Sequence, residues 1–384
     1  MILQDPWVTR HGTQALCAVL GLSGHRALFV GGCVRNTLLG APVTDIDIAT
    51  DALPQKVSQI AEAAGFKVIP TGIDHGTVTV IAQGVHHEVT TFRRDVQTDG
   101  RHAVVAFSTD IAEDAARRDF TMNALYAEPS GEVLDPLNGI GDLRARLVRF
   151  VGDPHKRIRE DYLRILRFFR FHAVYGDPSG GLDAEGLAAC AELAGGIDGL
   201  SRERVGAELR KLLAAVDPAP AVSAMAQAGV LARVLPGADA RGLALLVHLE
   251  QDLPPRWQRR LSLLGGQMDG LRLSRAEESE ITRIRDELGG THPPVVLGWT
   301  LGEVPAQDVL LCRAALLETP LPPDWRAELR LGAQSVFPVA ASDLMPQLSG
   351  PALGTTLKAL QTAWLASGLT LNKAALLKIA QNGG

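Results

Sequence analysis

The pattern of hydrophobic and polar positions divides the chain into two parts with different secondary structure. From residue 27 to about 151, short apolar or alternating runs such as "ALFVGG", "GTVTVIA" and "HHEVTTF" predict strands. A helix is expected over "LPQKVSQIAEAAGF", with Pro54 in its first turn and Gly65 at its end. After residue 152, strand patterns nearly vanish and helical segments follow one another, separated by Pro- and Gly-rich stretches. The pattern therefore predicts a mixed α/β region followed by an elongated all-helical region.

Composition narrows the class of protein. A chain of 384 residues with 46% apolar residues is long enough for two to four domains with ordinary cores. No charge-free apolar run reaches the roughly 18 residues of a membrane span, and the N-terminus lacks the apolar core of a signal peptide. The four cysteines are scattered, which favours a reducing cytoplasm over a disulfide framework or a cysteine zinc site. The net charge of −5 gives no global support for nucleic-acid binding, so such binding requires a local basic patch.

Two acidic residues interrupt an apolar strand pattern in "GAPVTDIDIAT". Asp45 and Asp47 stand two apart, so on a strand both carboxylates point to the same face. An ordinary solvated turn before a strand would explain them, but the upstream sequence favours chemistry. Gly31 and Gly32 lie between a predicted strand and a short helix, where backbone amides and the helix dipole can receive a phosphate. Carboxylate and phosphate oxygens are the ligands of Mg²⁺, whose charge removes the repulsion between the two acids.

A third acid is expected near this pair. Glu88 lies on the neighbouring predicted strand "HHEVTTF", although it could also be an ordinary exposed strand residue. Together the three acids predict two Mg²⁺ ions that activate an attacking hydroxyl and stabilise a leaving pyrophosphate. The adjacent His86 and His87 are expected to be solvent-facing or packed rather than metal ligands.

The glycine and aspartate segment "GGCVRNTLLGAPVTDIDIAT" resembles the signature of the DNA polymerase β nucleotidyltransferase superfamily. More narrowly, it resembles the class II tRNA nucleotidyltransferases (CCA-adding enzymes) and bacterial poly(A) polymerases. Similar motifs follow in order over residues 27–213: "HGTVTV", "EVTTFRRD", "TDGRHAVVAF", "RRDFTMNAL", "DPLNGIGDL", "REDYLRILRFFRF" and "SRERVGAELRKLL". The chain departs from the family at Asn36, where Asp is usual. The resemblance implies an α+β fold with a polymerase-β-like nucleotidyltransferase head of mixed sheet and helices (1–151), then an elongated all-α neck (152–216), body (217–300) and tRNA-binding tail (301–384).

The motif "RRDFTMNAL" is expected within a helix that begins near Ser108 or Asp110. The resemblance assigns its Arg118, Asp119 and Asn123 to the ribose and triphosphate of a bound nucleotide. Arg118 carries a fork of donors suited to phosphate oxygens, and the other two residues lie one helical turn apart and could reach one sugar. The alternative is a surface helix with ordinary ion pairs.

Two further segments are assigned by the resemblance. From the first motif it assigns Gly31, Gly32 and Arg35 to nucleotide binding. The segment "TDGRHAVVAF" resembles the flexible loop that in the family assists the switch from adding C to adding A. Its presence favours full CCA addition over an enzyme limited to CC.

The motif "REDYLRILRFFRF" carries a candidate base-reading site. On one helix, Glu160 and Asp161 would precede Arg164 by one turn, with Arg167 a further turn on. A surface ladder of ion pairs is the ordinary explanation. The resemblance implies instead that Asp161 and Arg164 form an amino-acid template, that Glu160 holds the arginine, and that Arg167 contributes to the nucleotide site. Cytosine and adenine both present an amino donor beside a ring-nitrogen acceptor, whereas uracil and guanine present the reverse, so an acceptor beside a donor selects C and A.

The same region supplies a local basic patch. Residues 144–172 contain nine Lys or Arg against three Asp or Glu, which would attract both RNA and a triphosphate. The next helix is expected to begin after Ser201, and Glu203 and Arg204 on it could brace the base-reading helix. Beyond residue 217 no further chemistry is evident. The basic residues there could contact RNA or form ordinary surface: Arg256, Arg259, Arg260, Arg272, Lys358, Lys373 and Lys378.

These observations predict template-independent addition of CCA to the 3′ end of tRNA. The expected substrates are CTP, ATP and tRNA, the cofactor is two Mg²⁺ ions, and the expected location is the cytoplasm without membrane attachment. A poly(A) polymerase, or an enzyme adding only CC or only A, shares every motif and remains an alternative. A different class, a non-catalytic RNA-binding protein on the same scaffold, would have no reason to keep three like charges together.

Overall fold

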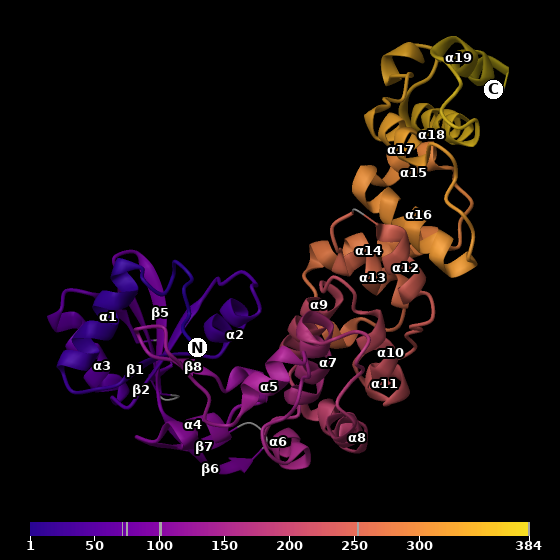
Figure 1. Ribbon diagram of the computed structural model, residues 1–384. Helices are drawn as coiled ribbons and strands as arrows, with labels where there is room; N and C mark the ends of the chain where they lie inside the picture. The colour runs from indigo at the N-terminus through magenta and orange to yellow at the C-terminus, as the bar shows by residue number, and fades with distance from the viewer. Residues whose placement is uncertain (71, 74–75, 100–101, 252, 383–384) are drawn as a thin grey trace. The chain divides into compact units, whose positions relative to one another are not determined.

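The computed structural model describes residues 1–382 except 71, 74, 75, 100, 101 and 252. Its contacts divide the chain into two compact units, residues 1–234 and residue 235 onward (Figure 1). The first unit contains a mixed sheet and then helices, and the described part of the second is helical, which confirms the predicted fold class. The finer division into head, neck, body and tail stays a prediction.

One mixed sheet forms the centre of the first part of this unit. All neighbouring strands are antiparallel except β2 and β5, which run parallel. The β-branched runs form the predicted strands, and Gln83 and Gly84, both with positive φ, make the turn between β4 and β5. The strand order is β3 (Lys67–Ile69), β4 (Thr77–Ala82), β5 (Val85–Thr91), β2 (Ile46–Thr50), β1 (Ala27–Val30), β8 (Tyr126–Ala127) and β9 (Val133–Leu134).

Three helices pack against this sheet. Helices α1 (His11–Leu22) and α3 (Pro54–Ala63) contact one another and lie together on one side of the sheet (Figure 1). As predicted, α3 starts at Pro54, and Gly65 follows its end with φ 79°. Helix α2 (Gly32–Leu38) follows β1 directly and contacts β1 and β2, so it begins beside the strand that carries Asp47.

The long helix expected after Ser108 is much shorter in the structure. Asp110 caps α4 (Ile111–Ala116) as predicted, but α4 ends before the "RRDFTMNAL" motif, which forms an extended stretch and a 3₁₀ turn (Thr121–Asn123). The reason is pairing with a distant segment: the Thr121 N–H donates to the Arg149 carbonyl at 3.0 Å, and Phe120 pairs with Phe150. Tertiary hydrogen bonds therefore override local helix propensity here.

The segment that resembles the flexible loop, residues 98–107, contains the end of strand β6 (Arg93–Asp99) and all of strand β7 (His102–Phe107), and the two strands pair antiparallel to each other. Gly100 and Arg101 of this segment, and His75 of "HGTVTV", lie outside the described residues.

Helices follow in the rest of the first unit, as expected after residue 152. The single helix predicted through the base-reading motif is divided at Asp161, which has extended φ and ψ of −156° and 106°. The Asp161 carboxylate accepts a hydrogen bond from the Leu163 N–H at 3.1 Å and thereby starts a second helix. The helices of this part are α5 (Gly139–Arg144), α6 (Pro154–Glu160), α7 (Leu163–Tyr175), α8 (Ala184–Glu192), α9 (Arg202–Leu213), α10 (Ala219–Gln227) and α11 (Val230–Val234).

The second unit is built from packed helices. Two glycines let α15 and α17 approach closely: a Cβ on Gly298 would lie 2.2 Å from the Leu329 carbonyl oxygen, and one on Gly332 would lie 1.9 Å from that of Val295. Among the described residues, no helix is long and apolar enough to cross a membrane. The helices are α12 (Leu243–Glu250), α13 (Trp257–Leu264), α14 (Arg275–Leu288), α15 (Pro294–Leu301), α16 (Glu303–Leu317), α17 (Trp325–Gln334), α18 (Gly350–Ala366) and α19 (Lys373–Asn382).

A buried ion cluster of Glu250, Arg256, Arg259, Arg260 and Asp308 joins three of these helices to the segment before α13. Arg259 and Arg260 are each 1% exposed, so the expectation that they are surface residues or RNA contacts is wrong. Their charges are matched by Glu250 on the preceding helix and by Asp308, which is 49 residues further along the chain than Arg259.

Candidate active site

Backbone pairing brings two of the three predicted metal acids together. Strands β2 and β5 are parallel and in a register that places Asp47 opposite Glu88. Asp45 immediately precedes β2, and the buried Ile46 and Ile48 alternate with the two aspartates. The Thr44 hydroxyl donates to a carboxylate oxygen of Asp45 at 2.8 Å. The three acids define the acidic cluster of this site: Asp45, Asp47 and Glu88.

The electrostatics of the acidic cluster are those of crowded carboxylates. Burial, together with the charges of Glu88 and Asp45, raises the pKa of Asp47 to about 6, although the charge of Arg118 acts in the opposite direction. Within the described part of the chain, no lysine or arginine forms an ion pair with any of the three acids. Arg118 therefore offsets part of the negative charge at Asp47 without pairing directly with an acid of the cluster.

The acidic cluster fits a hard divalent cation that shares its ligands with a substrate. Among the residues that the structure describes, no three or more His, Cys, Asp or Glu side chains form a group that could hold a metal ion. Mg²⁺ does not need such a group, because it is commonly held by one or two carboxylates together with waters and substrate phosphates. Carboxylate oxygens without a positive partner are suitable donors for such an ion.

The turn between β1 and α2 carries the glycines that are predicted to receive a phosphate. Gly31 has φ 68°, a conformation that L side chains rarely adopt, and its N–H donates to the Leu125 carbonyl at 3.0 Å. A Cβ at this position would lie 3.5 Å from Nη1 of Arg118. The open face of the turn and the guanidinium of Arg118 are therefore neighbours.

Arg118 is held in place from behind by two other groups. Its Nε donates to the Tyr126 hydroxyl at 3.0 Å and its Nη2 to Asp114 at 2.9 Å. Although burial alone would raise it, Arg118 and Arg117 hold the pKa of Asp114 down to about 2, so this carboxylate stays charged at neutral pH. The sequence reasoning missed Asp114 and Tyr126, which lie outside the quoted motif residues and gain their role only through the fold.

Arg35 is far more enclosed than a simple phosphate contact would be. It is 7% exposed, donates to the Asn36 side-chain oxygen at 3.0 and 2.8 Å and to the Tyr175 hydroxyl at 2.8 Å, and also donates to the Asn123 side chain. Its guanidinium carbon lies 4.1 Å from the centroid of the Tyr175 ring. All of these partners are neutral. The family departure at Asn36 adds one contact that an Asp could not make, because its amide donates to the Pro42 carbonyl at 2.8 Å.

The other residues assigned to ribose recognition also lie together. Asn123 donates to one oxygen of Asp119 at 2.9 Å, and Arg167 donates to the other through Nε and Nη2 at 2.8 and 2.5 Å. The predicted proximity of Asp119 and Asn123 thus arises from a 3₁₀ turn rather than from one helical turn. Arg167 contacts Asp119 across the structure, which the sequence spacing did not indicate.

The base-reading residues lie at the break between α6 and α7. Arg164 Nη1 donates to Glu160 at 2.6 Å, the contact expected if Glu160 holds the arginine. Asp161 accepts from Arg204 Nη2 at 2.6 Å, which is the bracing contact expected from α9. Ser201 precedes α9 as predicted, but its hydroxyl makes no capping hydrogen bond.

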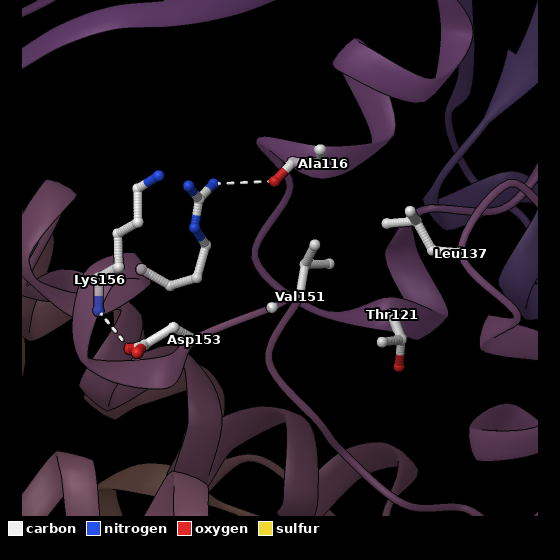
Figure 2. A pocket seen from close by; sticks show the side chains of 8 residues that line it. Ala116, Thr121, Leu137, Val151, Asp153 and Lys156 are labelled. Atoms are coloured by element: carbon white, nitrogen blue, oxygen red, sulfur yellow. Dashed lines mark hydrogen bonds between the residues drawn. The ribbon is translucent and has the colours of Figure 1, made fainter.

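A cavity of about 410 Å³ lies beside this region (Figure 2). Its apolar wall includes Leu137 and Val151, and Lys156 and Arg157 of α6 form its charged side. The Arg157 guanidinium reaches across to the Ala116 carbonyl, 3.0 Å away, as the dashed line in Figure 2 shows.

Comparison with known proteins places the chain in a family. Residues 27–149 match the model of the poly(A) polymerase head domain, and residues 182–241 match that of the "probable RNA and SrmB-binding site of polymerase A". The solved CCA-adding enzyme of Bacillus stearothermophilus in complex with CTP is 30% identical, with a TM-score of 0.76, and the match covers 99% of both chains. The chain therefore belongs to the family of CCA-adding enzymes and poly(A) polymerase heads.

Two curated relatives show higher identity over a shorter span. The human mitochondrial CCA tRNA nucleotidyltransferase 1 is 44% identical over 203 residues, which are 53% of this chain and 47% of the relative. The CCA-adding enzyme of Limosilactobacillus fermentum is 42% identical over 193 residues, 50% of this chain and 46% of the relative. The matched region thus spans about half the length of these curated relatives.

Proposed function

We propose that this protein adds CCA to the 3′ end of tRNA, using CTP and ATP and releasing pyrophosphate. The observation that carries the proposal is the register that sets Asp47 opposite Glu88, with Asp45 two residues before Asp47. The charge of Arg118 acts on Asp47, and its guanidinium lies beside the glycine turn. The identity to CCA-adding enzymes supports this activity over other transfers by the same family.

In the proposed reaction, the terminal ribose hydroxyl of the RNA attacks the α-phosphorus of the incoming nucleotide in line with the leaving pyrophosphate. The glycine turn and Arg118 bind and orient the triphosphate, while Asp119 and Asn123 contact the ribose. Asp45, Asp47 and Glu88 would hold two Mg²⁺ ions. When bound, these ions supply a more nucleophilic hydroxyl and neutralise charge on the departing pyrophosphate.

Selection of C and A is proposed to reside in Asp161 and Arg164. Asp161 offers acceptor oxygens to the amino group of the base, and Arg164 offers donors to the ring nitrogen. Uracil or guanine would leave both protein groups facing like partners, at a cost of roughly 1–3 kcal/mol for each unsatisfied group. Glu160 and Arg204 orient this pair through the contacts described above.

Arg35, which lies close to the glycine turn, and Arg167 on α7 are proposed to support the nucleotide site.

The chain is proposed to consist of four domains, of which the body and the tail bind tRNA. These are a head of residues 1–151, a neck of 152–216, a body of 217–300 and a tail of 301–384. A cytoplasmic location is proposed because all four cysteines are free and buried, as a reducing compartment allows.

The test is extension of a labelled tRNA transcript that ends at the discriminator base, with Mg²⁺ and CTP, ATP or both. We expect two added nucleotides with CTP alone and three, and no more, with both nucleotides. A long ladder with ATP would instead identify a poly(A) polymerase, and a product that stops at two with both nucleotides would identify a CC-adding enzyme. Binding of the transcript without extension would support a non-catalytic protein and overturn the proposal.

A further inference from the structure

We propose that Arg157 is a positioning residue for nucleotide selection, because it fixes the side chain of Arg164. This inference rests on the proposed base-reading role of Asp161 and Arg164. Arg157 lies on α6, seven residues before Arg164, and the break between α6 and α7 separates the two residues.

Arg164 is held at three points. Its Nη1 donates to the Arg157 carbonyl at 2.8 Å and to Glu160 at 2.6 Å. Its Nη2 donates to the Arg117 carbonyl at 3.2 Å. Of its five N–H groups, the Nε–H and one Nη2–H have no recorded protein partner among the described residues, and these remain to face a base.

Arg157 contributes, directly or through a neighbour, to each of the three contacts that hold Arg164. Its own backbone carbonyl accepts one of the hydrogen bonds from Arg164. Its Nη2 donates to the second oxygen of Glu160 at 2.5 Å, so one carboxylate bridges the two arginines. Its Nη1 donates to the carbonyl of Ala116, the residue directly before Arg117, at 3.0 Å. The Arg157 side chain therefore fixes both the carboxylate and the backbone segment that orient Arg164.

Burial makes these contacts restrictive. Arg157 is 7% exposed and the Glu160 side chain is 8% exposed, so water competes weakly for their hydrogen bonds. Without the guanidinium, Glu160 would keep only Arg164 as its ionic partner and could rotate with it. Hydrogen bonds weaken steeply as they bend, so a turned Arg164 would discriminate less between a ring-nitrogen acceptor and a ring N–H.

The helix offers a matched control. Arg159 lies two residues away on α6 and is exposed. Replacing Arg159 by methionine lowers the positive charge of this surface by the same amount as replacing Arg157. Any general effect of charge on RNA binding should therefore appear in both variants, whereas an effect on base choice should appear only when Arg157 is replaced.

The experiment compares Arg157→Met, Arg157→Lys, Arg159→Met and Arg164→Met in single-nucleotide extension, with kcat/KM measured for all four NTPs. We expect the preference for CTP and ATP over UTP and GTP to fall by about tenfold in Arg157→Met, the effect of one lost charge-assisted hydrogen bond. Arg157→Lys keeps the charge but has fewer directed donors. Its preference for CTP and ATP should therefore lie between those of Arg157→Met and the wild type. Arg159→Met should keep the wild-type preference.

Two outcomes separate this inference from the proposed function. An unchanged preference in Arg164→Met would overturn the base-reading assignment itself. A lost preference in Arg164→Met with an unchanged preference in folded Arg157→Met and Arg157→Lys would overturn only the role of Arg157. Thermal melting of each variant establishes that it is folded.

The cavity provides an independent test by chemical rescue. Since Arg157 lines the 410 Å³ cavity, truncation to alanine would leave space that a free guanidinium ion can enter. We expect guanidinium chloride, at tens of millimolar and far below denaturing concentrations, to restore the nucleotide preference of Arg157→Ala but not that of Arg164→Met. Equal responses to guanidinium and sodium chloride would contradict the proposal.

Discussion

The buried ion cluster of the second unit permits a quantitative test at Asp308. This carboxylate is fully buried and accepts from Arg256 Nε and Arg259 Nε, both at 2.7 Å. Arg259 and Arg260 in turn donate to Glu250, and Arg256 donates to Glu280, so three arginines are balanced by three carboxylates. The substitution Asp308→Asn changes the volume little and removes one negative charge. It leaves a single uncompensated positive charge among buried groups.

The expected cost follows from that unpaired charge. Breaking a buried ion pair by removing one partner costs about 3–5 kcal/mol, because the remaining charge loses its compensation without regaining water. For a unit of about 150 residues, each kcal/mol lowers the melting temperature by roughly 2–4 °C. The transition of the second unit should therefore shift down by roughly 6–20 °C.

Differential scanning calorimetry at pH 7 would measure the shift. Arg241→Gln is a suitable control, since Arg241 is 91% exposed and its ion pair with Asp239 is screened by solvent. The double variant Arg259→Met/Asp308→Leu removes one charge of each sign and leaves the Arg256–Glu280 and Arg260–Glu250 pairs in place, so it should recover much of the lost stability. If Asp308→Asn melts within a degree or two of the wild type, the reasoning about uncompensated charge is wrong.

Two further predictions concern the metal site and the pH dependence of stability. Mg²⁺ should raise the melting temperature of the wild type but not that of Asp47→Asn. This variant should also lose nucleotide incorporation while it still binds tRNA. If Mg²⁺ stabilises both proteins equally, the metal binds elsewhere. Burial lowers the pKa of His172, with Asp177 opposing, so the unfolded chain takes up this proton first as the pH falls. The free energy of unfolding should therefore be steady above about pH 6.5 and decline below it by at most about 1.4 kcal/mol per pH unit for this group. His172→Leu should flatten part of that decline in urea titrations from pH 8 to pH 5, and the part due to His87, whose pKa burial also lowers, should remain.

Local patterns in the sequence predicted several elements of the first unit. Alternation located β4 and β5, and the Pro and Gly positions gave the limits of α3, because these signals depend on neighbouring residues alone. The extent of α4 and the break at Asp161 could not be predicted in this way. The extent of α4 is decided by a partner far away in the chain, through the bridge from Phe120 to Phe150. At the break, the Asp161 carboxylate accepts the Leu163 N–H nearby and also accepts from Arg204 on α9, which is distant in the sequence.

The same distinction applies to the candidate site. The acidic residues were identifiable because a repeated charge in an apolar strand is conspicuous in the sequence itself. The burial of Arg35 could not be identified from the sequence, because Tyr175, which stacks on it, is 140 residues away and belongs to no motif. Arg259 and Arg260 read as surface residues for the same reason: their counter-charges come from Glu250 on another helix and from Asp308 further along the chain.

The register between β2 and β5 links correct folding to catalytic competence. His87, buried beside Glu88, bonds through its ring to the Thr13 hydroxyl at 2.9 Å on the opposite face of the strand. A slip of one residue would turn His87 towards the acidic cluster and push the Glu88 carboxylate into the apolar core. A sheet in the wrong register would thus be destabilised for two reasons, the buried charge of Glu88 and the lost packing contact of His87. The register that gives the most stable sheet is therefore also the register that positions the acids. A molecule with mispaired strands would be unstable, so it would not persist as a folded enzyme with a misplaced site.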